Sequence, residues 1–323
     1  MKHTTFFAAA IIVTGSFTST AWAESYDFEI GLAYSGGEFD GSQTILTNGG
    51  TIFNSVSTDT DDLNLIGSWY FKGLSDDKGP RARATLVDRA SVLSAGYARS
   101  EQTISTVLTN DDPNFPFPPL DTTIEVDSDL YGLDLRYVDR DSGWIGAIGV
   151  TSTSTKLGGS ISASADATAW RVGVGKYLAT NTTLGLDFSQ TDAGGGGDAT
   201  GIGVSFEHLG DLGQNWQYAV DVQYENVDSD GLVEVDTVRA AFSFYPNRDF
   251  EFGIALEDAS GTGSDTFGVE GFASWFVTPG FRVAADYRVD DVDFLGNVAI
   301  GGTPPTNSSA DQSSFRIGAS VRF

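Results

Sequence analysis

Apolar and polar residues alternate along most of this chain, and this pattern limits the possible folds more than any other feature of the sequence. In the last ten residues, every odd position from Phe315 to Phe323 is apolar and every even position is Ser, Arg or Gly. Successive side chains of a β-strand point to opposite faces, so this strand has one apolar and one polar face. Such a sheet fits a bilayer only as a closed barrel, because lipid cannot pair the backbone groups of an open edge. We therefore predict that the apolar face meets lipid and the polar face surrounds a watery lumen.

Fourteen segments carry this alternation. They cover residues 26–34, 63–71, 85–106, 131–137, 144–150, 170–174, 184–188, 202–206, 216–224, 238–244, 250–256, 267–275, 281–287 and 314–323. An even number is expected of single-chain bacterial barrels, and it places both termini on the same side. The prediction is an all-β fold, a transmembrane antiparallel up-and-down β-barrel of about 14 strands, formed by residues 24–323 as a single domain. Twelve or sixteen strands remain alternatives, because the pattern is weak between Lys72 and Thr106.

Three stretches are expected to be irregular. Residues 80–90 alternate poorly, so we place the third strand from Thr85 to Thr106 with a bulge near Arg89. The Gly/Ser/Asn/Thr-rich stretch that ends near Ser57 is expected to be a loop. Residues 111–120 contain four prolines, which cannot donate to a β-ladder, so they too are expected to form a loop.

The N-terminus has the features of a secretory signal peptide over residues 1–23. Lys2 and His3 precede an apolar run, and Ala21-Trp22-Ala23 supplies a small-x-small cleavage site before Glu24. The alternative is a buried N-terminal helix. The chain has no Cys, which excludes disulfides and thiolate metal ligands. We therefore expect a protein exported across the inner membrane.

The positions of the tryptophans support the barrel prediction. Trp69, Trp144, Trp216 and Trp275 each lie beside a short connection on the side where the termini meet, whereas Trp170 falls nearer the middle of a segment. Interfacial rings of Trp and Tyr are expected at the level of the lipid headgroups. Aromatic core residues of a soluble sandwich would not gather at one end.

No chemistry of an enzyme is visible in the sequence, and we expect no catalytic residue, cofactor or metal. His208 is the one His after the signal peptide, and we place it in a turn after the eighth segment. Nucleophilic catalysis normally needs a base beside the nucleophile. The acidic cluster Asp59, Asp61 and Asp62 lacks the Gly and Glu positions of an EF-hand loop. With a net charge of −26, the chain is expected to have no nucleic-acid partner.

The charged residues on the polar faces are the candidate pore-lining residues. They are Asp27, Glu29, Asp134, Arg136, Arg171, Asp187, Asp221, Arg239, Glu270, Arg282, Asp286, Arg288, Arg316 and Arg322. Four of the arginines lie on the last two strands and form one basic wall. Closure of the barrel should bring Asp27 and Glu29 close to Arg322. An arginine or lysine facing lipid at the bilayer midplane would cost about 2–4 kcal/mol, so these positions indicate a wet interior.

The terminal strand with Phe323 as its last residue resembles the C-terminal signature of bacterial outer-membrane β-barrels. The resemblance implies that the barrel-assembly machinery recognises this strand, with Phe323 as the assembly signal. The stretch from Gly79-Pro80 to Asp88-Arg89-Ala90-Ser91 is similar to a segment of putative general porins of proteobacteria. The Pro-Glu-Phe-Gly-Gly constriction loop of the 16-stranded general porins is absent. The stretches 110–121 and 290–311 are the alternatives for an inward-folded loop, and each could equally be an exposed loop.

These observations predict an outer-membrane porin, a water-filled channel for passive diffusion of ions and small hydrophilic solutes. The acidic composition suggests a mild cation preference. One alternative is a non-transporting structural or adhesive outer-membrane barrel, and another is a soluble secreted β protein. The expected partners are outer-membrane lipid and lipopolysaccharide, the barrel-assembly machinery, and the permeating ions and solutes. A homo-oligomer is left open.

Overall fold

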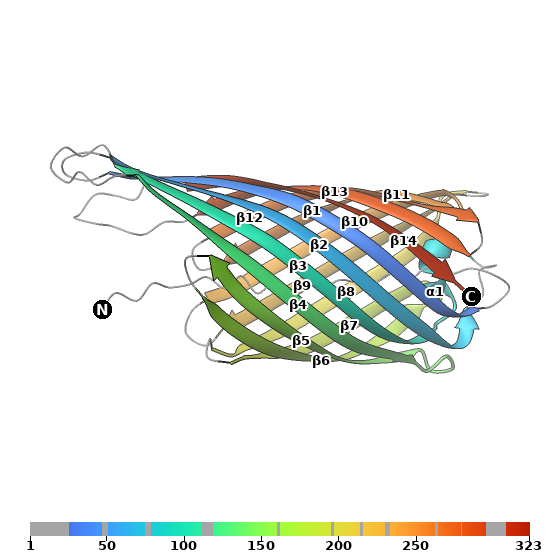
Figure 1. Cartoon of the computed structure of the whole chain (residues 1–323). Coiled ribbons are helices and arrows are strands. Elements are labelled where there is room, and N and C mark those ends of the chain that lie inside the picture. Colours follow the sequence, from blue (N-terminus) through green and yellow to red (C-terminus); the bar gives the residue numbers. More distant parts are fainter. Residues whose placement is uncertain are drawn as a thin grey trace.

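The chain folds into a closed antiparallel β-barrel of fourteen strands (Figure 1). A computed structural model describes residues 26–46, 51–74, 79–110, 119–159, 162–194, 197–213, 216–229, 233–261, 264–278, 280–294 and 308–323. The strands are β1 (Tyr26–Leu46), β2 (Thr51–Leu74), β3 (Ser91–Asn110), β4 (Leu120–Val138), β5 (Trp144–Gly159), β6 (Ala163–Ala179), β7 (Thr182–Ala193), β8 (Ala199–Asp211), β9 (Gln217–Ser229), β10 (Val233–Asn247), β11 (Phe250–Gly261), β12 (Ser264–Thr278), β13 (Phe281–Phe294) and β14 (Ser308–Arg322). The predicted fold class and strand number are confirmed. The expected signal peptide and most of residues 111–120 lie outside the described residues.

The first and last strands close the barrel. Ile30 of β1 lies opposite Val321 of β14. The N–H of Phe28 donates to the carbonyl of Phe323 at 3.0 Å, and the N–H of Phe323 donates back at 3.1 Å. Neither strand is therefore left with an unpaired edge at this seam, as a sheet in lipid requires.

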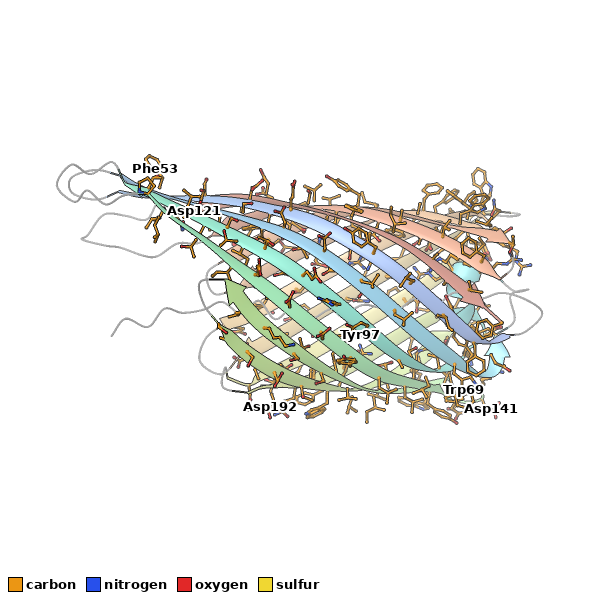
Figure 2. The ribbon with its side chains drawn as sticks, in the orientation of Figure 1. Phe53, Trp69, Tyr97, Asp121, Asp141 and Asp192 are labelled. Atoms are coloured by element: carbon orange, nitrogen blue, oxygen red, sulfur yellow. The ribbon has the colours of Figure 1, made fainter. Side chains whose placement is uncertain are left out.

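The barrel carries its large apolar side chains on the outside. Ile30, Ile148, Ile254 and Ile317 are each 49–59% exposed, while their neighbours along the strand point inward. Figure 2 shows the side chains that project from the outer surface along the length of the barrel. An outer surface of this kind matches a lipid environment and not the surface of a soluble β protein. Within the described residues, no helix is both long and apolar enough to cross a membrane.

Exposed aromatic residues lie on the outer face of the barrel at two levels, called here the two belts. The first lies at the end where Phe323 is found, called here the terminal end, and includes Trp69 (Figure 2) and, from their places at the ends of strands, Trp144, Trp216 and Trp275. The second lies further along the strands, where neighbouring rings form the pairs Tyr34–Phe315, Tyr97–Tyr131 and Trp170–Phe188. Trp170 therefore belongs to the second belt. Eight residues separate Phe315 from Phe323, about 26 Å at roughly 3.3 Å per residue, which is on the scale of the apolar band of outer-membrane barrels.

Strands β1–β4 extend well beyond the second belt, as a projection whose far part carries Phe53 and Asp121 (Figures 1 and 2). β1 and β2 have 21 and 24 residues, against 12 in β11. The prediction of a loop up to Ser57 was therefore wrong for most of its length, because Gly37 pairs with Thr60 and Gly41 with Val56. Ladder hydrogen bonds join backbone groups and need no apolar side chains, so apolar alternation detects only the part of a strand that faces lipid.

His208 also lies within a strand, in contrast to the turn predicted for it. It belongs to β8, and its ring contacts Thr182 Oγ1 at 2.8 Å and Tyr218 Oη at 3.4 Å. These contacts place His208 among aromatic and polar neighbours at the terminal end.

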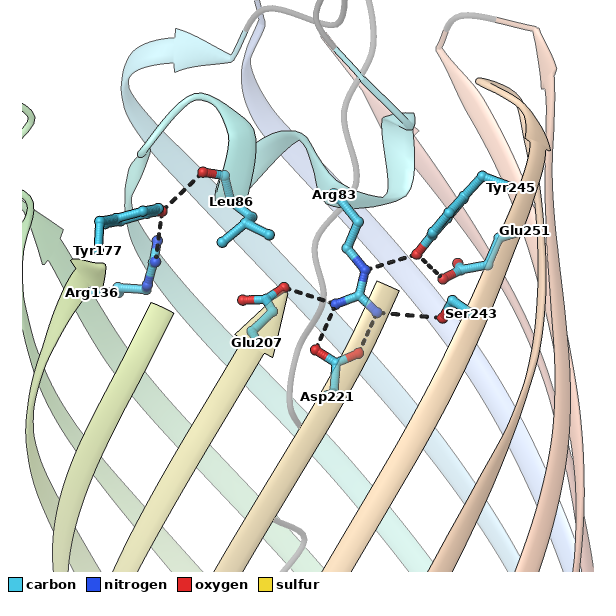
Figure 3. A network of polar contacts seen from close by, with 9 residues as sticks. All are labelled: Arg83, Leu86, Arg136, Tyr177, Glu207, Asp221, Ser243, Tyr245 and Glu251. Atoms are coloured by element: carbon cyan, nitrogen blue, oxygen red, sulfur yellow. Dashed lines mark hydrogen bonds and ion pairs between the residues drawn. The ribbon is translucent and has the colours of Figure 1, made fainter. Parts of the chain in front are cut away.

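The connection between β2 and β3 differs most from the prediction. Its described part is residues 79–90, called here the mouth segment, with a 3₁₀ turn at Arg81–Arg83 and the short helix α1 at Ala84–Val87. β3 begins at Ser91, so the strand predicted from Thr85 with a bulge near Arg89 was wrong over residues 85–90. Arg89 instead has a φ of 50°, the left-handed region that ends the helical turn. The segment folds into the barrel at the terminal end (Figures 1 and 3).

Candidate channel interior

The arginines of β10, β13 and β14 lie on the inner wall and are paired with carboxylates. Arg239 Nη2 is 2.7 Å from Glu270. Arg288 Nη2 is 2.6 Å from Asp290 and 2.9 Å from Glu257. The pairs Arg239–Glu270 and Arg288–Glu257 each join strands that are two apart in the barrel, and Arg288 and Asp290 both lie on β13. The predicted basic wall is therefore largely neutralised.

Two more ion pairs extend this wall. Arg316 Nε lies 2.8 Å from Asp286, and Arg282 Nη2 lies 3.6 Å from Glu251. The Arg316 side chain is 52% exposed, against 17% for Arg282, which lies nearer the terminal end. The wall is therefore open to solvent in the middle of the barrel and enclosed toward that end.

The seam between β1 and β14 is one of the enclosed places. Glu29 Oε2 lies 2.9 Å from Arg322 Nε and accepts a hydrogen bond of 3.0 Å from the hydroxyl of Tyr70. The guanidinium of Arg322 lies 5.4 Å from the ring centre of Phe276, a cation–π distance. Asp27, also expected here, is exposed at the start of β1 and takes no part in this ion pair.

The opposite wall, formed by β4–β9, is more acidic. Arg171 of β6 pairs with Asp134 of β4 at 3.0 Å. Asp187 of β7 and Glu225 of β9 lie on the same wall, and neither forms an ion pair within the described part of the chain.

Glycines on neighbouring strands lie beside these acidic side chains, and Gly173 makes room for Asp187. A Cβ at Gly173 would lie 2.3 Å from Asp187 Oδ1, and one at Gly201 would lie 3.4 Å from Glu225 Oε1. The first distance means that the Asp187 carboxylate would have to move if Gly173 carried a side chain. The two carboxylates therefore lie beside residues without side chains on the inner face of the wall.

Arg136 and Asp221 also point inward, but they hold the mouth segment. Arg136 Nη1 donates to the carbonyl of Ala90 at 2.9 Å, and Arg136 Nη2 donates to the hydroxyl of Tyr177 at 3.3 Å. Asp221 accepts hydrogen bonds from Arg83. Both residues are occupied by contacts at the terminal end.

Arg83 of the mouth segment is the centre of a buried polar network (Figure 3). Its guanidinium lies 2.8 Å from Glu207, 2.6 Å from Asp221 and 2.8 Å from the hydroxyl of Tyr245, and its side chain is 7% exposed. Tyr245 in turn donates to Glu251 at 2.6 Å. Burial by itself lowers the pKa of Arg83, but Tyr245, Asp221 and Glu207 outweigh it and hold this pKa well above the ordinary value. The guanidinium therefore stays charged.

Further contacts hold the mouth segment on other sides. Arg81 Nη1 lies 2.5 Å from Asp249 in the β10–β11 turn, and the Arg81 N–H donates to the carbonyl of Arg248 at 3.1 Å. The Tyr177 hydroxyl donates to the carbonyl of Leu86 at 3.0 Å. Leu86 is 1% exposed in a cluster with Leu74, Val138, Leu209, Tyr245 and Phe276, among others. The terminal end of the lumen is therefore filled by a small core.

Several functional side chains were missed in the sequence. They are Tyr70, Arg83, Glu207, Glu225, Glu251, Glu257 and Asp290. Glu225, Glu251 and Glu257 alternate with apolar residues, so a stricter count of parity would have found them. Asp290 was assigned to a loop. No signal marks Arg83, because its stretch has no alternation and its partners lie more than 120 positions away in sequence.

The described acidic residues do not make a metal site. No group of three or more His, Cys, Asp or Glu side chains in this part of the chain could hold a metal ion. Asp62 instead accepts a hydrogen bond of 3.2 Å from Ser35. Acidic side chains such as Asp62 and Glu270 are therefore held by hydrogen bonds and ion pairs to other side chains.

Comparison with known proteins gives similarity in structure only. No model of a known protein family matches the sequence, and no curated protein matches it. The Acinetobacter baumannii outer membrane protein Omp33 is 16% identical, with a TM-score of 0.50 over 93% of this chain and 99% of that one. A deltaS2S3 mutant of the monoaromatic hydrocarbon channel TodX is 12% identical, with a TM-score of 0.59 over 92% and 91%. The chain therefore has the closed β-barrel fold of outer-membrane porins and channels.

Proposed function

We propose that this protein is an outer-membrane channel for passive diffusion of ions and small hydrophilic solutes. The observation that carries the proposal is a closed barrel whose charged inner wall is open to solvent in its middle, where the Arg171 and Arg316 side chains are 45% and 52% exposed. Fourteen strands give a barrel wider than the eight-stranded barrels that side chains fill. Bulky or apolar solutes would be rejected by pore size and desolvation, and inner charges would bias which ions pass.

The charges of the wall favour cations. The inner arginines are matched by carboxylates, as in the pairs Arg239–Glu270 and Arg316–Asp286. Asp187 and Glu225 on the opposite wall have no such partner within the described residues. A surplus of fixed negative charge along the path attracts cations and repels anions.

Refolded protein in a planar lipid bilayer tests both statements. We expect discrete conductance steps, and a reversal potential across a salt gradient that shows cation preference. A reversal potential of the opposite sign would refute the selectivity. Complete absence of steps, both from wild type and from a variant without the Arg83 side chain, each shown to be folded by heat-modifiable gel mobility, would refute the channel function.

A non-transporting structural or adhesive barrel is the second candidate. The observation that favours it is the mouth segment, which fills the terminal end of the lumen around Arg83 and Leu86. The two candidates differ in one measurement, because a permanently filled barrel passes no current at any voltage. The same recordings, made on wild type and on a variant without the Arg83 side chain, therefore decide between them.

The location and partners follow from the same proposal. The terminal end, with its short turns, would face the periplasm, and the projection of β1–β4 would face outward. Outward-facing acidic residues beyond the second belt, such as Glu38, Asp59 and Asp127, would then meet lipopolysaccharide through divalent cations. Cell fractionation tests the location, and loss of co-purifying lipopolysaccharide with a chelator tests the contact. The oligomeric state can be measured by light scattering in detergent.

A further inference from the structure

The mouth segment reaches across the whole width of the barrel. It leaves the wall between β2 and β3, and Arg83 binds residues of β8, β9 and β10. In a ring of fourteen strands, β2 and β9 are seven positions apart, as are β3 and β10. These are opposite sides of the barrel. A solute moving along the lumen would therefore meet this segment.

Side chains from the walls fill the space beside the mouth segment. Tyr70, Ser243 and Tyr245 are at most 1% exposed, and Phe276 and Arg322 are 3% and 5% exposed. These inward-pointing residues belong to strands on both sides of the segment. The described structure is therefore closed at its terminal end, although the middle of the lumen is open.

Charged contacts hold the segment in addition to apolar ones. Leu86 and Val87 are the large aliphatic side chains of the segment that join the buried cluster, and its other members there are alanines. By contrast, the single guanidinium of Arg83 contacts two carboxylates and two hydroxyls. Removing one partner of a buried charged network leaves the others uncompensated, which is strongly unfavourable. The position of the segment should therefore depend on Arg83.

The barrel wall does not depend on the segment. β2 and β3 pair from Phe71–Ser91 to Ile52–Asn110 without a break in register, so their ladder is complete without residues 79–90. The first and last strands are joined by their own hydrogen bonds. The mouth segment can therefore move while the barrel stays closed.

We propose that the mouth segment is a gate at the terminal end of the channel, and that the contacts of Arg83 hold this gate closed. The gate rests on the proposed channel function. Permeation then requires the segment to leave its partners Glu207, Asp221 and Tyr245. The wild-type protein should show mostly closed time with brief openings.

Single-channel recording of Arg83→Ala tests whether the contacts of Arg83 hold the gate closed. We expect the fraction of open time to rise by about tenfold or more, because the two carboxylates then repel each other instead of holding the segment. Arg99→Ala is the matched control. Arg99 is an outward-facing arginine with an exposed ion pair of 2.7 Å to Glu101, so its removal should leave the open time unchanged.

A reversible disulfide tests the gate without relying on the stability of one variant. The backbone hydrogen bond from Arg81 to Arg248 brings these two residues within the range that a disulfide spans. The chain has no other Cys, so the Arg81→Cys/Arg248→Cys pair can be oxidised and reduced cleanly. Oxidation should hold the channel closed, also in the Arg83→Ala background, and reduction should restore the openings.

The outcomes separate the gate from the channel. If wild type conducts, and neither Arg83→Ala nor oxidation of the cysteine pair changes the open time, the gate is refuted while the channel function stands. If neither wild type nor folded Arg83→Ala ever conducts, both proposals fail. If wild type is silent and Arg83→Ala conducts, the gate is supported as a segment that is closed at rest.

Discussion

The terminal end and the middle of this barrel use the same kinds of side chain in opposite ways. At the terminal end, the Arg83 and Arg322 side chains are 7% and 1% exposed, and they hold buried partners in place. In the middle, Arg171 and Arg316 form pairs of similar length, but their side chains are about half exposed. A charged lumen residue therefore indicates a water path only where its surroundings leave room for water.

The largest expected contrast is in the reactivity of single cysteines. Ser189→Cys lies on the wall near the middle, whereas Ser243→Cys replaces a residue that is 0% exposed beside Arg83. We expect a charged methanethiosulfonate reagent to modify the second at least roughly a hundredfold more slowly, because a buried thiol reacts only when the structure opens. Val222→Cys on the lipid face is the control that should not react. Equal rates at the two lumen positions would show that the terminal end is open.

The next contrast is in stability. Arg322→Ala leaves Glu29 buried without its ion partner and should lower the free energy of unfolding by about 3–5 kcal/mol. Arg171→Ala breaks a solvent-exposed pair and should cost about 0–1 kcal/mol. Urea unfolding in lipid vesicles, starting from refolded protein, measures both. Similar losses for the two variants would mean that the two regions do not differ in burial.

A smaller effect is expected for ion selectivity, and it belongs to the middle region alone. Asp187→Asn and Glu225→Gln should each reduce the cation-to-anion permeability ratio by roughly twofold, because they remove carboxylates that face the open lumen. Glu101→Gln, on the outer surface, is the control and should leave the ratio unchanged. Reversal potentials in a salt gradient give the ratio. An unchanged ratio in both lumen variants would place the ion path elsewhere.

The smallest effect concerns the exposed rim of the terminal end. The Asp139 carboxylate accepts hydrogen bonds from the Ser142 hydroxyl at 2.5 Å and from the N–H of Asp141 at 3.2 Å, which lower the pKa of Asp139 below its ordinary 3.8. A lowered folded-state pKa gives stability that is present above the ordinary value and is lost as the pH falls through the lowered one. Ser142→Ala should therefore be less stable than wild type near pH 6, and this difference should shrink toward about pH 2. A difference that does not depend on pH would contradict the assignment.

Much of the barrel could be predicted because every strand faces lipid directly, so the sequence of each strand must itself carry the alternation. Every lipid-facing residue must be apolar, so Ile254 or Ile317 can be assigned to the outer face from its neighbours in sequence alone. The same logic gave inward positions for residues such as Arg239 and Glu270. It failed for residues 35–46 and 51–57, where strands pass beyond the bilayer and no longer need apolar side chains.

The sequence by itself determined the outward faces of the strands and the position of the first aromatic belt, since each depends on local alternation in contact with lipid. It favoured fourteen strands but left twelve and sixteen open, and the structure settled the number. Only the tertiary structure decided which charges meet and where the lumen is filled. Arg81 lies 168 positions from its partner Asp249, and Arg83 lies 138 from Asp221. Contacts of this kind arise when the barrel closes around the mouth segment, and no local pattern encodes them.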